Sequence, residues 1–179
     1  YNKLTKLKLH NLSSLESVSC IFNDITELSF YNCGSLKEVF CEYNLLESLD
    51  VSSCESLSLL SCSNNNLTDL NVKGGNNLKT LDCDNNFLES LEIPGSLSSL
   101  SCKNNNLDFL SLPPVTESLK TYSYTPQNAI ALESRFDSID FSRFYSINDS
   151  LSNYLWYYKN TTIAPSQNEE GLFTFDESY

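Results

Sequence analysis

The sequence predicts a mainly β protein: a right-handed solenoid with strands on both sides of each coil, followed by a small β-rich C-terminal module. Two observations lead to this fold class. A skeleton of the form L-x-x-[LV]-x-C-x-x-N-x-L-x-x-L recurs over residues 1–125, mostly at a step of 21 residues. A fixed period of this length is typical of stacked repeat units. Beyond residue 125 the skeleton stops, and aromatic residues separated by turn-forming clusters take its place.

The repeat can be followed as columns of equivalent residues. The two leading apolar columns are Leu15, Leu36, Leu57, Leu78, Leu97 and Leu119, and Val18, Val39, Leu60, Leu81, Leu100 and Tyr122. The next two columns are Cys20, Cys41, Cys62, Cys83, Cys102 and Tyr124, and Asn23, Asn44, Asn65, Asn86, Asn105 and Gln127. The step is 19 residues between Leu78 and Leu97 and 22 between Leu97 and Leu119. One coil cannot bury its own leucines, so we expect the coils to stack and share a core.

Each repeat contains two similar halves. Residues 46–54 follow the pattern L-x-x-L-x-V-x-x-C, which repeats the L-x-x-V-x-C-x-x-N of residues 36–44. The halves are 10 and 11 residues long and show no helical period. Their inward positions at i, i+3 and i+5 fit an extended segment entered through a bend. We therefore predict a strand on each side of every coil and little or no helix.

With these columns the chain resembles leucine-rich repeat proteins over residues 1 to about 125. The short repeat of two similar halves resembles the bacterial class sometimes called IRREKO. This resemblance implies a solenoid of stacked coils in a cell-surface or secreted bacterial protein. It also implies a shallow strand face that binds a protein or a host-surface ligand.

The inward cysteines and asparagines both have structural explanations. An inward amide has two donors and an acceptor for backbone groups left free where the chain turns. We therefore predict a structural ladder of Asn23, Asn44, Asn65, Asn86 and Asn105. Buried thiols act as small hydrophobes, so we predict a reduced, structural ladder of Cys20, Cys41, Cys62, Cys83 and Cys102. Disulfides between neighbours about 4.8 Å apart, or a bound metal, are alternatives, although the chain has no C-x-x-C pair. We expect no metal and no cofactor.

The array begins and ends irregularly. Residues 1–14 correspond to the second half of a coil, 21 residues before its equivalent in the next repeat. Repeat arrays normally start with a polar cap, so we expect an N-terminal truncation and further chain upstream. Gly74-Gly75 and Pro94-Gly95 are expected to close their coils as turns. Pro113-Pro114 is expected to loosen the array just before it ends.

The outward side chains suggest where a partner binds. Small or polar residues predominate between the inward columns, and five apolar or aromatic residues interrupt them: Ile21, Phe22, Phe40, Tyr43 and Leu59. An exposed cluster of this kind on a strand face is a candidate partner site. The alternative is that missing upstream coils, or a neighbouring molecule, cover these residues.

The other half of the repeat carries an acidic strip made of Glu27, Asp50, Asp69, Asn71 and Glu92. We interpret it as a solvated face that keeps the array soluble. Calcium binding and glycoside hydrolysis by paired carboxylates are alternatives. The sequence has no G-G-x-G-x-D repeat of the kind that binds calcium. An extended strip also has no cleft that would shift the pKa of a catalytic carboxylate.

The last part of the chain is expected to form a separate module over residues 126–179. Residues 119–127 keep the columns but replace leucine and cysteine by Tyr122 and Tyr124, which suits a terminal coil. The run NYLWYYKNTTIAPSQNEEGLFTF resembles the strand–turn–strand segment with the core tryptophan of bacterial immunoglobulin-like domains. Core packing is then expected for Trp156, with ligand stacking as the alternative. A full sandwich needs about 100 residues, so we expect a partial domain or a β-rich cap.

Composition excludes several function classes. The net charge of −12 disfavours a nucleic-acid partner, and no apolar run is long enough to span a membrane. His10 is the only histidine, and phosphate-loop and dinucleotide fingerprints are missing. We therefore expect a non-enzymatic binding module, and we leave its oligomeric state open. A structural spacer without a ligand is the alternative, and a carbohydrate-binding or carbohydrate-active protein is a more distant one.

Overall fold

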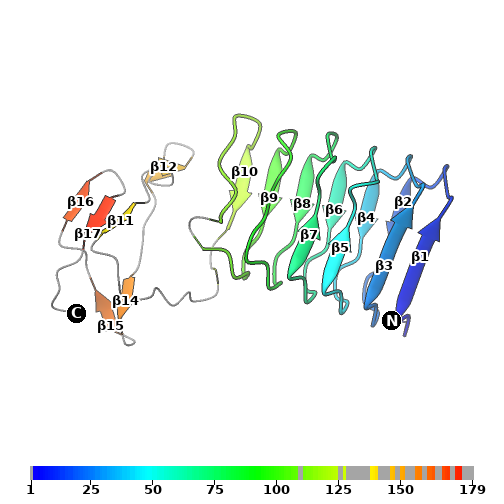
Figure 1. The fold of residues 1–179 in the computed structure, drawn as a ribbon, viewed down its shortest axis with the longest axis horizontal. Helices are drawn as coiled ribbons and strands as arrows, with labels where there is room; N and C mark the ends of the chain where they lie inside the picture. Colours follow the sequence, from blue (N-terminus) through cyan, green and yellow to red (C-terminus); the bar gives the residue numbers. More distant parts are fainter. Residues whose placement is uncertain are drawn as a thin grey trace. The chain divides into compact units, whose positions relative to one another are not determined.

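The computed structural model describes residues 2–108, 111–124 and 127, together with seven short strands between residues 138 and 174. The chain separates into two compact units, Tyr1–Ile130 and Ala131–Tyr179. The first unit is a stack of coils whose strands lie side by side, from β1 to β10 (Figure 1). Every strand pair in this unit is parallel, as expected for a chain that climbs by one coil at a time.

One side of the stack is a sheet of six parallel strands. In spatial order they are β2 (Ser17–Ser19), β4 (Glu38–Phe40), β6 (Leu59–Ser61), β8 (Thr80–Asp82), β9 (Ser99–Ser101) and β10 (Thr121–Ser123). The register follows the repeat, because Val39 pairs with Leu60 and Leu60 with Leu81. The central residue of each strand points inward and its two neighbours point outward.

The other side of the stack is less regular. It holds two parallel pairs, β1 (Lys6–His10) with β3 (Glu27–Tyr31), and β5 (Ser48–Asp50) with β7 (Asp69–Asn71). The predicted strand on this side is absent at residues 90–92. The step into the next coil is 19 residues instead of 21, and the missing two residues lie where earlier coils make a turn. Val51 and Val72 accept the turn hydrogen bonds of those coils, from Cys54 N (2.9 Å) and Gly75 N (3.1 Å).

The predicted columns fill the interior. Leu36, Leu57, Leu78 and Leu97 are at most 1% exposed, as are Cys41, Cys62, Cys83 and Cys102. The prediction of a mainly β solenoid is therefore confirmed, with about six turns of stacked parallel strands and no helix among the residues that the structure describes. The likeness to leucine-rich repeat proteins remains a prediction.

The second unit contains antiparallel strands. β11 (Ser138–Asp140), β17 (Leu172–Thr174) and β16 (Gln167–Glu169) form one sheet in that order. Two hairpins pair β12 (Ser146–Ile147) with β13 (Ser150–Leu151), and β14 (Trp156–Tyr158) with β15 (Thr161–Ile163). The expected core position of the Trp156 side chain lies outside the described part of the structure.

The asparagine column joins each coil to the one before it. Asn65 Nδ2 donates to Cys41 O (3.0 Å) in the preceding coil and to Cys62 O (3.1 Å) in its own. Asn65 Oδ1 accepts from Leu46 N (3.1 Å), again in the preceding coil. Asn44, Asn86 and Asn105 make the equivalent bonds. Gln127 takes over the role at the end, with Leu107 N and Cys102 O as partners.

Replacing Asn65 by alanine tests this ladder. The change leaves Leu46 N–H without a partner in the interior and removes one of the two amide donors of Cys41 O and of Cys62 O, so we expect the free energy of unfolding to fall by about 2 kcal/mol or more. Urea denaturation followed by circular dichroism measures the loss. Asn66→Ala is the matched control and should change stability by less than about 0.5 kcal/mol. Equal midpoints for the two variants would contradict a structural role for the ladder.

Candidate interaction surface

The outward face of the six-stranded sheet, with the residues that directly follow each strand, is called the strand face below. Its side chains alternate with the inward valines, leucines and cysteines, so their positions are fixed by the core. Because the register steps by one repeat from strand to strand, equivalent residues form straight columns across this face. The face is therefore a rigid support for whatever side chains it carries.

Two aromatic residues form a stacked pair at the end of the first two strands. The rings of Phe22 and Tyr43 lie 4.4 Å apart with an interplanar angle of 15°. The two side chains remain 42% and 49% exposed. Stacking therefore fixes the two rings relative to each other without removing them from solvent, which prepares an apolar contact surface.

The backbone at this pair has a left-handed conformation. Phe22 and Tyr43 have φ values of 55° and 56°. The residues at the same position in the next three coils are all asparagines, with φ values of 53° to 57°: Asn64, Asn85 and Asn104. Asparagine tolerates this conformation, whereas a bulky side chain there costs roughly 1 kcal/mol or more. The first two coils thus place aromatic residues where the backbone favours asparagine.

The structure brings together only some of the five predicted contact residues. Phe22 and Tyr43 are in contact, and Phe40 lies half-buried on the strand that leads to Tyr43. Leu59 is half-buried at the start of its strand, paired with Glu38 and Thr80 and not with the aromatic residues. Ile21 directly precedes Phe22 and is half-buried.

Leu45 and Phe87 are exposed apolar residues close to the ladder asparagines that the sequence analysis did not single out. Their side chains are 46% and 48% exposed. Both directly follow a ladder asparagine, in a column whose other members are Asp24, Asn66 and Asn106. The polar members of this column indicate that it faces solvent. The sequence could therefore have shown that the two apolar residues in it are exposed.

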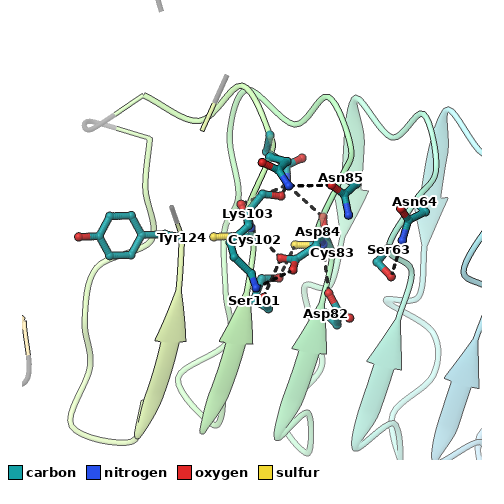
Figure 2. A network of polar contacts seen from close by, with 12 residues as sticks. Ser63, Asn64, Asp82, Cys83, Asp84, Asn85, Ser101, Cys102, Lys103 and Tyr124 are labelled. Atoms are coloured by element: carbon teal, nitrogen blue, oxygen red, sulfur yellow. Dashed lines mark hydrogen bonds and ion pairs between the residues drawn. The ribbon is translucent and has the colours of Figure 1, made fainter. Parts of the chain in front are cut away.

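A polar network lies further along the strand face (Figure 2). Asp84 Oδ1 accepts hydrogen bonds from Ser101 Oγ (2.7 Å) and Lys103 N (2.7 Å), and Asp84 Oδ2 lies 3.4 Å from Lys103 Nζ. Asp82 Oδ1 accepts from Asp84 N at 3.1 Å. Burial raises the pKa of Asp82, and the nearby charges of Asp84 and Glu42 raise it further. Acidic groups are thus concentrated on the middle strands of this face.

The acidic strip on the opposite side is largely paired. Glu27 binds Lys6 (3.0 Å) and Lys8 (2.6 Å), and these bonds lower the pKa of Glu27 to about 2. Glu92 binds Lys73 (3.0 Å) across an open hollow beside β7, where the expected strand is missing. Within the part of the chain that the structure describes, no group of three or more His, Cys, Asp or Glu residues is placed to hold a metal ion.

The cysteine column is chemically protected. All seven cysteines are buried free thiols. Cys41 Sγ and Cys83 Sγ donate to Ser61 O (3.5 Å) and Ser101 O (3.4 Å) in the next coil. Burial raises the pKa of Cys20 to about 11, that of Cys102 to about 12, and that of Cys62 well above 9.0. Because the thiolate is the reactive form, these residues are not suited to nucleophilic chemistry.

His10 is exposed, with its Nε2 3.3 Å from Ser29 Oγ and its ring in a T-shaped contact with Tyr31 at 6.0 Å. These contacts include no cysteine or carboxylate, so they do not form a catalytic pair.

No family model, curated protein or solved structure matches the chain. Between residues 2 and 174, as far as the structure describes them, no helix has the length and apolarity needed to cross a membrane.

Alkaline unfolding tests the burial of the thiols. An unfolded thiol loses its proton near pH 9, whereas the folded thiols keep theirs to about pH 11 or higher. Their contribution to stability is thus complete below about pH 9 and is lost as the pH rises through the folded pKa values. Each such thiol should add about 1.4 kcal/mol per pH unit to the slope in this range. Urea titrations at several pH values measure that slope, and Cys62→Ala/Cys83→Ala should reduce it. An unchanged slope in this variant would show that the thiols titrate alike in both states.

Proposed function

We propose that this chain is a non-enzymatic binding module of the leucine-rich repeat type, belonging to a secreted or cell-surface bacterial protein. Its strand face binds a protein or host-surface ligand through the region of Phe22 and Tyr43. The observation that carries this proposal is the stacked, exposed aromatic pair held in backbone positions that the other coils give to asparagine.

The energetics of recognition support a role for this pair. Aromatic residues are enriched among those that contribute most to protein–protein affinity. A side chain that is already fixed by stacking loses little conformational entropy on binding. An unfavourable backbone conformation that persists at an exposed site is also more common where function demands it. The pair therefore has both the chemistry and the rigidity of an interface centre.

The remaining assignments follow from the repeat itself. The columns of leucine, cysteine and asparagine support the leucine-rich repeat identity, because each position has a defined role in the stack. We assign residues 1–125 to the array and residues 126–179 to a β-rich cap or partial immunoglobulin-like domain. The likeness of both parts to bacterial surface proteins supports the extracellular location.

A structural spacer is the second candidate function. The outward residues of β2 and β9 are all serines, which offer a partner little contact area. An array that only projects another domain would need nothing more on its surface. A binding module needs the aromatic pair for affinity, whereas a spacer does not.

Phe22→Asn/Tyr43→Asn tests the proposed site. Asparagine is the residue of the other coils at this position, so the variant should fold with unchanged or higher stability. A binder is first selected against the wild-type array from a displayed library of extracellular protein fragments. The variant should weaken its binding by about 10- to 100-fold in biolayer interferometry.

Phe87→Asn is the matched control, because Phe87 is as exposed as Tyr43 and its column also contains asparagines. It should leave the Kd within about twofold, since surface changes away from an interface have small effects. Equal affinities for wild type and the double variant would exclude the aromatic pair as the binding centre.

Deleting one coil separates a binding face from a spacer. Removal of residues 36–56 or 57–77 shortens the array by the same 21 residues, but only the first removes Phe40 and Tyr43. We expect the shorter array without residues 57–77 to keep its affinity and the one without residues 36–56 to lose it. If both variants retain full binding to the selected partner, the face near Tyr43 is not the site.

A further inference from the structure

The middle of the strand face has acidic side chains on both sides of two serines. β4 leads from Phe40 to Glu42, β8 leads from Asp82 to Asp84, and Ser61 and Ser63 of the β6 coil lie between them. Neighbouring strands are about 4.8 Å apart, so the flanking carboxylates project from backbones roughly 10 Å apart. The serines between them have short side chains that do not separate the acidic groups.

Glu42 has an unsatisfied carboxylate oxygen. Its Oε2 atom is buried, and no hydrogen-bond partner contacts it in the described structure. None of the ion pairs found among the described residues includes Glu42 or Asp82. A buried polar atom without a partner is costly and therefore calls for an explanation. The Glu42 residue as a whole is half-buried, so a positively charged group from outside that reaches its carboxylate would provide the missing donor.

The next coils show how this face accommodates a cation. Residues 42, 63, 84 and 103 form one column, in which Lys103 pairs with Asp84 of the neighbouring coil. Ser63 holds the corresponding place beside Glu42, and its hydroxyl accepts a hydrogen bond from Asn64 Nδ2 instead. The chain thus supplies a lysine for one carboxylate of the column and none for the other.

The surroundings of Glu42 suit a long cationic side chain. Phe40 is half-buried two residues before it, and Tyr43 is 49% exposed directly after it. The methylene groups of lysine or arginine pack well on aromatic rings, and a guanidinium group can also stack on them. Burial and then the charges of Asp84 and Glu42 raise the pKa of Asp82 although the charge of Lys103 lowers it, so Lys103 does not fully offset the acidic groups here.

We propose that Glu42 and Asp82 receive a lysine or arginine side chain of the partner protein, with its stem packed against Phe40 and Tyr43. The inference rests on the proposed function and specifies the partner: a protein segment with a cationic residue next to an apolar one. The net charge of −12 adds long-range attraction to such a segment, whereas the contact with Glu42 gives it a defined place.

The test uses a short peptide, acetyl-Gly-Leu-Arg-Leu-Gly-amide, titrated into the ¹⁵N-labelled protein. Backbone shifts should change mainly at residues 40–43, 61–63 and 82–84. A peptide with neutral citrulline in place of arginine should bind at least about fivefold more weakly, because a charge-assisted hydrogen bond is lost.

Matched protein variants separate a local site from general acidity. Glu42→Gln/Asp82→Asn should weaken the peptide at least about fivefold. It should leave folding intact, because both residues are only half-buried and neither forms an ion pair among the described residues. Glu47→Gln/Asp69→Asn removes the same charge from exposed positions outside the strand face and should change the Kd by less than about twofold. Equal weakening by both variants would overturn the inference, as would shifts that map elsewhere or full competition by calcium chloride.

The selected protein binder distinguishes this inference from the function on which it rests. Loss of that binder in Phe22→Asn/Tyr43→Asn but not in Glu42→Gln/Asp82→Asn would overturn the cation site alone. Retention of the binder in both variants would overturn the proposed function as well.

Discussion

The structure depends on one interaction, the bonding of each inward asparagine amide to the backbone of two coils at once. Its nitrogen donates to carbonyls of its own and the preceding coil, and its oxygen accepts an N–H of the preceding coil. The amide therefore fixes both the spacing and the register between coils. Straight columns on the surface exist because this register does not drift. A surface site assembled from several coils, such as the strand face, inherits its geometry from bonds that lie in the core.

The same ladder restricts the surface next to it. The residue before each of these amides is held at a positive φ, so most coils use asparagine there. Phe22 and Tyr43 depart from that rule at a cost in backbone energy that their mutual stacking partly offsets. Directly before Tyr43, Glu42 carries a buried oxygen without a donor. Local stability is reduced at both places, and they adjoin each other on one face. That coincidence is the physical basis of the interaction site that we propose there.

Much of this fold follows from the sequence, because a strict period translates directly into inward columns. The leucine, cysteine and asparagine ladders occupy the interior as their spacing predicts. The missing strand at residues 90–92 was harder to foresee. A repeat that is two residues shorter can lose a strand in either of its two halves. Only the backbone of the structure shows that the second half loses it. Side-chain rotamers and neighbours one coil away determine the stacking of Phe22 on Tyr43 and the isolated oxygen of Glu42. The aligned repeat sequence does not give this information. Leu45 and Phe87 were missed because their column is otherwise polar.

The arrangement of hydrogen bonds has a mechanical consequence. Bonds between coils run along the stacking direction, so tension applied to the two ends of the array loads them in series and not in parallel. The boundary with the fewest bonds then separates first, and we expect this at the boundaries within the described coils that lack a strand pair on the second side, between β3 and β5 and after β7. Each released coil frees 21 residues, or about 70 Å of contour length. An array of this design would lengthen in steps under load and absorb work while its remaining coils stayed folded.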